Sequence, residues 1–112
     1  MDLSTMAEKL GLESPECEEI LSLFIDTTES DLDTLGRAIQ EGDAALAVQS
    51  SHSIKGAAAN LGLQEIRAMA GGIEMNARQG ILAGAEHAAE AIRHHLDSLK
   101  GEVFECLKRH PR

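Results

Sequence analysis

The sequence predicts an all-α protein, an antiparallel up-and-down four-helix bundle with a short N-terminal capping helix, formed as one domain over residues 1–112. Three observations predict this fold. Phe24 and Phe104 are the only aromatic residues, so aliphatic side chains and alanine must build the core, which suits close-packed helices better than sheets. Apolar residues recur at three- and four-residue steps along four long segments. Only short glycine-containing breaks separate these segments, which favours antiparallel neighbours.

The first two helices are predicted from their start and stop signals. A short helix is expected from residue 4 or 5 to residue 9, with Gly11 as its stop. A long helix is expected over residues 14–40, because Ser14 can cap it and Pro15 suits the first helical position. Its apolar positions are Cys17, Ile20, Leu21, Phe24, Ile25, Leu32, Leu35 and Ile39.

Glycines separate the remaining helices. Gly42 can end the long helix and Asp43 can cap the next one, which is expected over residues 44–61. With Gly62 and Gly80 as further breaks, the last two helices are expected over 63–79 and about 83–107. The apolar stripe of the fourth helix comprises Ile66, Met69, Ala70, Ile73 and Ala77. The stripe of the last helix comprises Ala88, Ala91, Ile92, Leu96, Leu99, Val103, Phe104 and Leu107.

The composition excludes several classes of function. Ten basic and nineteen acidic side chains give a net charge of −9, which disfavours nucleic acid and anionic membrane surfaces as partners. No stretch approaches the roughly 18 apolar residues of a membrane span, and no signal peptide is evident, so we expect a cytoplasmic protein. Cys106 and His110 have the four-residue spacing of two metal ligands on a helix, and Cys17 is the other cysteine. We interpret the cysteines as free thiols and expect no metal site.

The third helix has an unusual outward face. With Ile54 as the reference direction, the core face comprises Leu46, Ala47, Ser50, Ala57, Ala58 and Leu61, and His52 points about 160° away. The outward face comprises Ala45, Val48, Gln49, His52, Lys55, Gly56 and Ala59. Long charged side chains are nearly absent from it. Gly56 costs the helix roughly 1 kcal/mol relative to alanine, so we expect something to approach closely beside His52.

Charge is also distributed unevenly around His52. Residues 44–64 contain no acidic side chain, whereas an even spread would place roughly 3.6 there. Lys55 is the only formal charge in this window. A partner with a pocket of carboxylates could therefore dock at this patch of an otherwise acidic protein.

These residue types suit phosphoryl transfer. A largely neutral imidazole needs no activating base to attack phosphorus, and Lys55, three residues after His52, can place its ammonium near the phosphoryl oxygens. Positioning and charge stabilisation carry most of this chemistry, so Mg²⁺ can come from the partner. On its own, an exposed histidine or lysine is usually an ordinary surface residue. Gln49 and Asn60 are interpreted as contacts to a partner, as residues that orient the imidazole, or as solvated helix residues.

The segment HSIKGAAANLG, His52 to Gly62, resembles the HxxKG(A/S)xxxxG signature of histidine-containing phosphotransfer (HPt) domains. The resemblance implies that His52 is phosphorylated on Nε2, that Lys55 assists, and that Gly56 leaves room. It also implies transfer to and from aspartates of response-regulator receiver domains, with no bound cofactor. A hybrid sensor histidine kinase is a further expected partner, and we expect a monomer. The residues expected to dock the partner are Ala45, Val48, Gln49, Gly56, Ala59 and Asn60.

Two other functions remain open at this point. The dimerisation domain of a sensor histidine kinase resembles His-(Glu/Asp)-x-x-x-Pro, whereas Ser53 follows His52 and the next proline is Pro111. No glycine-rich nucleotide-binding segment is evident, which argues against autophosphorylation from ATP. A catalytically silent helical adaptor would keep the fold and bind receivers or kinases without transfer.

Gly71 and Gly72, in the middle of the fourth helix, indicate either close packing or a local bend.

Overall fold

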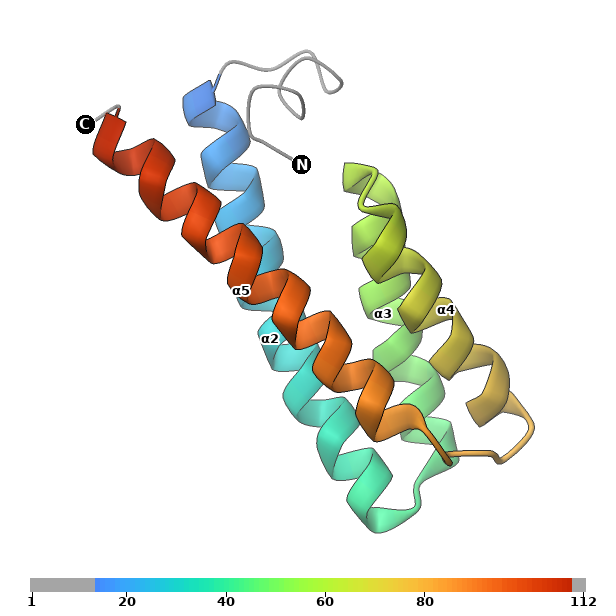
Figure 1. The fold of residues 1–112 in the computed structure, drawn as a ribbon. Helices are drawn as coiled ribbons and strands as arrows, with labels where there is room; N and C mark the ends of the chain where they lie inside the picture. The colour runs from blue at the N-terminus through green and yellow to red at the C-terminus, as the bar shows by residue number, and fades with distance from the viewer. Residues whose placement is uncertain (1–13, 110–112) are drawn as a thin grey trace.

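Four helices make up the structure. The computed structural model describes residues 14–109, with side chains described over 19–103. Over that range the helices are α2 (Ser14–Glu41), α3 (Ala44–Leu61), α4 (Gln64–Arg78) and α5 (Ala85–Arg109), and no strand is present (Figure 1). The all-α prediction is confirmed, and each predicted boundary lies within two residues of the observed one. The predicted helix at residues 4–9 lies outside the described residues.

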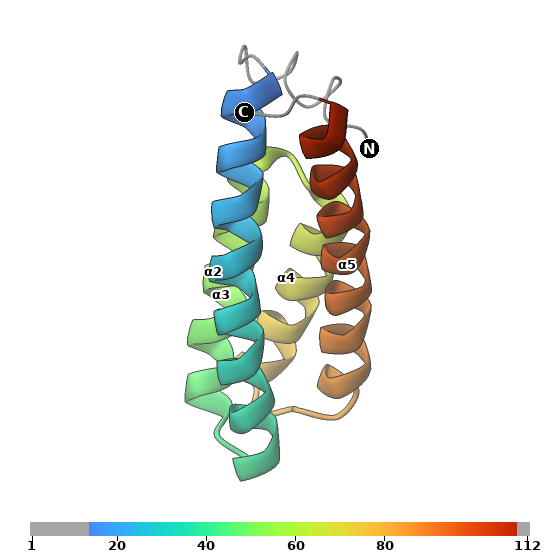
Figure 2. The same cartoon turned by 90° about the vertical axis from the view of Figure 1, so that its left-hand side faces the viewer.

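The helices form an antiparallel bundle in which each helix packs against two neighbours. α2 contacts α3 and α5, and α4 contacts α3 and α5. The long helices α2 and α5 run beside each other, and the shorter α3 and α4 form a hairpin next to them (Figures 1 and 2). None of the described helices is both long enough and apolar enough to cross a membrane.

Two tight turns set the positions of α3 relative to its neighbours. Gly42 and Gly62 adopt positive φ angles of 68° and 71°, a conformation that glycine takes without strain. The Asp43 side chain accepts a hydrogen bond from the Leu46 amide at 3.0 Å, as predicted for an N-cap. After Gly62, the Leu63 amide donates to the Ala58 carbonyl at 2.9 Å. Turns this short leave little freedom in the register of α4 against α3.

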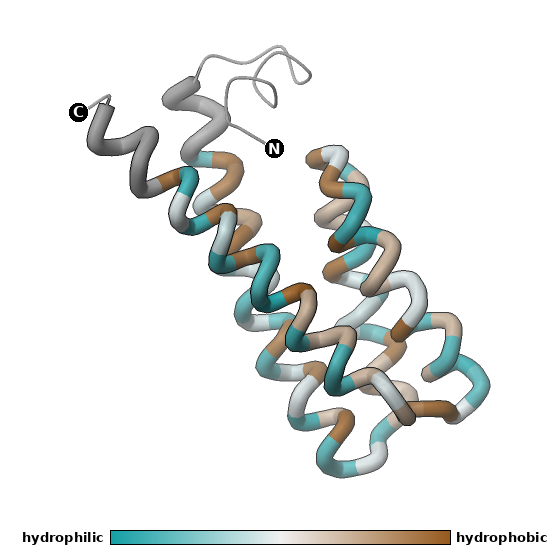
Figure 3. The backbone as a smooth tube through the Cα atoms, in the orientation of Figure 1, coloured by the Kyte–Doolittle hydropathy of each residue, from teal (hydrophilic) through white to brown (hydrophobic). Residues whose placement is uncertain are grey.

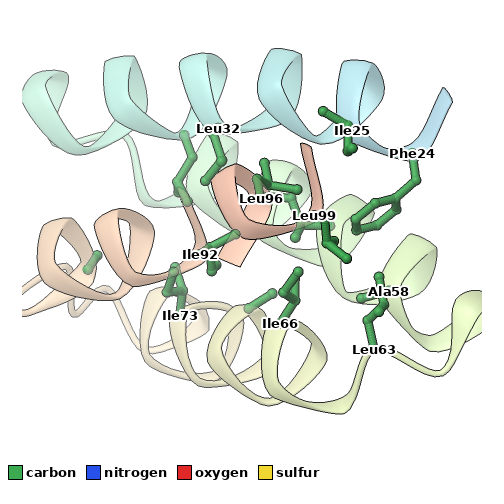
Figure 4. Packing of buried hydrophobic residues seen from close by; sticks show 14 of the residues in the cluster. Phe24, Ile25, Leu32, Ala58, Leu63, Ile66, Ile73, Ile92, Leu96 and Leu99 are labelled. Carbon is green, nitrogen blue, oxygen red and sulfur yellow. The ribbon is translucent and has the colours of Figure 1, made fainter. Parts of the chain in front are cut away.

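The core lies along the axis of the bundle and is aliphatic apart from Phe24. Apolar and polar residues are interspersed along each helix (Figure 3). Side chains from α2, α4 and α5 converge around Leu96 (Figure 4). The buried residues are Leu21, Phe24, Ile25, Leu32, Leu35, Ala38, Ala47, Ile54, Ala58, Leu63, Ile66, Ala70, Ile73, Ala77, Ala85, Ile92, Leu96, Leu99 and Val103. Most of the predicted apolar positions are therefore confirmed.

The predicted stripe of α2 was wrong at one position. Ile20 is 36% exposed, because it lies about 100° around the helix from Leu21, which points directly into the core. Thr28, which the prediction omitted, is fully buried in the same row as Leu21. Its hydroxyl has no hydrogen-bond partner among the described residues. The predicted positions at Cys17, Phe104 and Leu107 lie outside the described side chains.

Candidate functional site

The two faces of α3 lie as the sequence predicts. Ile54 is fully buried, whereas the His52 side chain is 62% exposed. Of the predicted core face, Ala47, Ser50 and Ala58 are buried, and the others are half-buried: Leu46, Ala57 and Leu61. Ser51, which the prediction omitted, is also buried, and its hydroxyl donates to the Ala47 carbonyl at 2.6 Å.

A buried carboxylate on α4 contacts the imidazole of His52. Glu74 is 4% exposed, and its Oε2 lies 2.9 Å from Nδ1 of His52. The same oxygen accepts a hydrogen bond from Nη2 of Arg78 at 2.7 Å. Its other oxygen, Oε1, lies 2.6 Å from Nζ of Lys55. One carboxylate therefore holds the side chains of His52, Lys55 and Arg78.

The two cations keep this carboxylate ionised. Burial alone would raise the pKa of Glu74, but Lys55, then Arg78 and His52, lower it from 4.5 to about 2. Oε1 of Glu74 makes no hydrogen bond of acceptable geometry, so Lys55 lowers the pKa of Glu74 as a close ion pair whose charges are 2.6 Å apart. A buried carboxylate without such partners would take up a proton instead. Glu74 is therefore an anion at neutral pH.

The charge of Glu74 determines which nitrogen of His52 carries the proton. An ionised carboxylate can only accept hydrogen bonds, so Nδ1 of His52 must be the protonated nitrogen at 2.9 Å. In the neutral imidazole, Nε2 then keeps its lone pair. The ring is held by one nitrogen and is nucleophilic at the other. Neither Gln49 nor Asn60 provides this contact, so the predicted alternative that they orient the imidazole is not what the structure has.

Lys55 has a partner that the sequence did not suggest. The spacing alone placed its side chain on the same side of the helix as His52, and in the structure its Nζ is bound to Glu74 and its side chain is only 36% exposed. Both groups meet the same carboxylate, so the ammonium still lies close to the imidazole. The role of Lys55 in transfer stays a prediction.

The stretch of sequence around His52 contains no acidic residue, but neighbouring helices place acidic side chains against α3. Besides Glu74 from α4, Asp31 from α2 reaches α3, where its Oδ2 accepts a hydrogen bond from the Ser53 hydroxyl at 2.7 Å. Counting acidic residues in one stretch of sequence cannot reveal acids that lie on other helices. Around the imidazole itself, Lys55 and Arg78 outnumber the single charge of Glu74. The sequence predicted a locally neutral or basic patch without acids, and the cluster beside His52 contains an acid but has one excess positive charge.

The residues predicted to dock a partner form one exposed face. Val48 is half-buried, and the others are exposed: Ala45, Gln49, Gly56, Ala59 and Asn60. A Cβ atom added at Gly56 would meet nothing within 4 Å, so no group of the described protein requires glycine there. The same is true of Gly36, Gly72 and Gly101. What distinguishes Gly56 is its position one helical turn after His52. Docking by these residues stays a prediction.

The described residues contain no group of three or more histidine, cysteine or acidic side chains that could hold a metal ion. The weak candidate ligands Cys17, Cys106 and His110 lie outside the described side chains. His95, on α5, pairs with Glu65 at 3.2 Å.

Glu74 is a residue of the candidate site to which the sequence reasoning assigned no role, although a signal for it existed. It lies four residues after Ala70 and three before Ala77, at the edge of the apolar stripe of α4. An acid at that position must be paired if it is buried, and Arg78 follows at the four-residue spacing of a helical ion pair. The partner across the helix pair, His52, could only be found once the packing of α3 against α4 was known.

Comparisons with known proteins agree with this geometry. The family model of the Hpt domain matches residues 19–102. The structure is similar to the crystal structure of histidine-containing phosphotransfer protein B (HptB) from Pseudomonas aeruginosa PAO1, with a TM-score of 0.78 and 26% identity. That similarity covers 98% of this chain and 96% of the other. A comparison with curated protein sequences gave no significant match. The chain therefore belongs to the Hpt domain family and has a histidine phosphotransfer role in the phosphorelays of two-component signalling.

Proposed function

We propose that His52 is the phosphoacceptor, which takes a phosphoryl group from the aspartyl phosphate of one receiver domain and passes it to an aspartate of another. The observation that carries this proposal is the 2.9 Å contact between Nδ1 of His52 and the ionised Glu74. This contact fixes the proton on Nδ1, so Nε2 is the nucleophile. It also sets His52 apart from the other described histidines, none of which meets a buried carboxylate.

The transfer step balances without a cofactor on this chain. The lone pair of Nε2 forms the N–P bond as the P–O bond to the donor aspartate breaks, and the donor recovers its carboxylate. Because Nδ1 keeps its proton, the ring gains positive charge in this step. Glu74, at 2.9 Å, is placed to stabilise that charge. The second transfer reverses these changes when an acceptor carboxylate attacks phosphorus.

The cations of the site complement those of the partner. Lys55 and Arg78 give the Glu74 cluster a net charge of +1, which favours the approach of a phosphoryl group and of an acidic receiver pocket. We expect Mg²⁺ to be bound by the receiver domain, and this chain to need no cofactor of its own. We further expect a cytoplasmic monomer. We expect no autokinase activity, because no glycine-rich nucleotide-binding segment is evident in the sequence.

The decisive experiment follows acid-labile radiolabel from several phosphorylated receiver domains. Wild type should acquire label and His52→Gln should acquire none, because the amide has no nucleophilic nitrogen. His94→Gln, at an exposed position on α5, is the matched control and should transfer normally. Failure of wild type with every donor would favour the silent adaptor, whereas labelling from ATP alone would favour a kinase domain.

The docking part of the proposal makes a separate prediction at Gly56. Gly56→Leu should favour the helix by roughly 1 kcal/mol, and its Cβ atom would meet no described group within 4 Å, yet it should slow transfer by at least about tenfold because the side chain obstructs the partner. Gly101→Leu, in a similarly open position on α5, is the control. Equal transfer rates for both variants would argue against docking beside Gly56.

A further inference from the structure

We infer that Gly71 is a positioning residue for Lys55, because the small size of the residue at this position leaves open the path along which the lysine crosses α4 to reach Glu74. This inference rests on the proposed function of His52 and adds a residue that positions Lys55 for it. Lys55 comes from α3, whereas Gly71 and Glu74 lie three residues apart on one face of α4. The glycine thus has a task that concerns the site rather than the backbone.

The contact between Gly71 and Lys55 supports this assignment. A Cβ atom at Gly71 would lie 3.5 Å from Cδ of Lys55, and no other group outside the local helix backbone lies within 4 Å of it. Further along the same side chain, Nζ is 2.6 Å from Oε1 of Glu74. The stem of the lysine therefore passes over Gly71 before its ammonium meets the carboxylate.

The backbone gives no other reason for this glycine. Gly71 lies inside α4 and its φ angle is not positive, so any L-residue could adopt its conformation. A glycine there disfavours the helix relative to alanine. Of the two predicted explanations of Gly71, close packing or a local bend, the structure shows an ordinary contact with one flexible side chain of the site.

Gly72 provides an internal comparison. It is the next residue of the same helix, but a Cβ atom there would meet nothing within 4 Å. It borders a hollow of about 230 Å³ between α4 and the start of α5. A larger side chain at position 72 has open space, whereas one at position 71 must displace Lys55.

The size of the substituent decides the effect. A distance of 3.5 Å is ordinary van der Waals contact, so alanine fits at position 71 without moving the lysine. A leucine extends further and occupies the path of the stem. The ammonium then moves into water and loses Glu74. A lysine that is free to move must lose more side-chain entropy to assist transfer.

The test compares Gly71→Leu with Gly71→Ala and Gly72→Leu, each in the wild-type and the Lys55→Ala backgrounds. We would measure label acquisition from a phosphorylated receiver domain and the pKa of the Glu74 carboxyl by NMR. Gly71→Leu should slow transfer by about tenfold and raise the Glu74 pKa, as Lys55→Ala does. The other two variants should stay within about twofold of wild type. In the Lys55→Ala background, Gly71→Leu should have no further effect.

Two results would overturn the inference. One is a Gly71→Leu variant with the wild-type transfer rate and Glu74 pKa, and the other is an equal slowing in the Lys55→Ala background, which would indicate an obstructed partner. If Gly71→Leu does not fold, Gly71→Met takes its place, because its unbranched side chain is easier to accommodate and still extends beyond a methyl group into the path of the lysine. If wild type acquires no label, the proposed function fails, but the Glu74 pKa still tests whether Gly71 positions Lys55.

Discussion

Ion pairs of lysine and arginine join the described helices of this bundle in two regions, and the two regions differ in burial. Between α2 and α5, Lys100 meets Glu29 at 2.9 Å and Arg93 meets Asp33 at 3.6 Å, with all four side chains at least 36% exposed. Between α3 and α4, Glu74 is 4% exposed and meets three partners. Exposed pairs contribute little to stability, whereas a buried charge is costly unless it is fully paired. The buried cluster therefore points to function, and the exposed pairs do not.

The two regions should also respond to opposite ends of the pH scale. The pKa of Glu74 is lowered by Lys55, Arg78 and His52, so its contribution to stability is present above its ordinary pKa of 4.5 and is lost as the pH falls toward 2. The pKa of Lys100 is raised, chiefly by Glu29, from 10.5. Its contribution is present below that value and is lost as the pH rises through the raised pKa.

The largest effect is expected at the buried carboxylate itself. Glu74→Ala removes the group that fixes the His52 tautomer and stabilises the ring charge, so label acquisition should fall by about 100-fold. The free energy of unfolding should fall by roughly 2 kcal/mol, because Lys55 and Arg78 lose their partner but can reach water. Stopped transfer reactions and urea unfolding measure the two quantities.

The matched control for this variant lies in the other region. Glu29→Ala removes a carboxylate that also contacts a lysine, but at the exposed α2–α5 surface. It should leave the transfer rate unchanged and stability nearly so. A Glu74→Ala variant that behaves like Glu29→Ala would remove the distinction between the two regions.

The second prediction concerns acid. As the pH falls from about 5 to about 2, Glu74 should account for a loss of at most about 3 kcal/mol in the free energy of unfolding, because its pKa in the folded protein is well below that of the unfolded chain. Other carboxylates also titrate in this range, so the informative quantity is the difference between wild type and Glu74→Gln. The Gln variant should lose less stability in urea unfolding series across these pH values. Parallel curves would mean that Glu74 is not held in its ionised form.

The smallest effect is expected from removing one cation of the cluster. Lys55→Ala should slow transfer by about tenfold and reduce stability by only about 1 kcal/mol, since Arg78 still pairs with Glu74. Lys100→Ala, from the exposed region, should not alter transfer. A cooperative loss of folding in Lys55→Ala would show that the lysine supports the bundle rather than the chemistry.

The fold was accessible from the sequence because its determinants are local. Gly42 and Asp43 carry the signals of a helix end and a helix start within two adjacent residues, and the structure has a positive φ and an N-cap there. The outward direction of His52 followed from the helical period alone. Ile20 was misplaced because it lies at the edge of a stripe, where the period does not decide between burial and exposure.

The site was accessible only in part because its geometry depends on packing between helices. The sequence pointed to His52 and Lys55, which lie on one helix. It did not point to the hydrogen bond to Glu74, which joins residues 22 positions apart, nor to the lysine stem over Gly71. These contacts depend on the angle and register at which α4 meets α3, and no local pattern contains that information.

The contact between His52 and Glu74 has a consequence for how the chain can change in length. One residue inserted into α3 after His52, or into α4 before Glu74, would rotate the helical residues that follow by about 100°, which would carry the carboxylate and the imidazole apart. Related proteins with this arrangement should therefore keep the number of helical residues between these two positions. The connection between α4 and α5, which contains no residue of the cluster, should be free to lengthen.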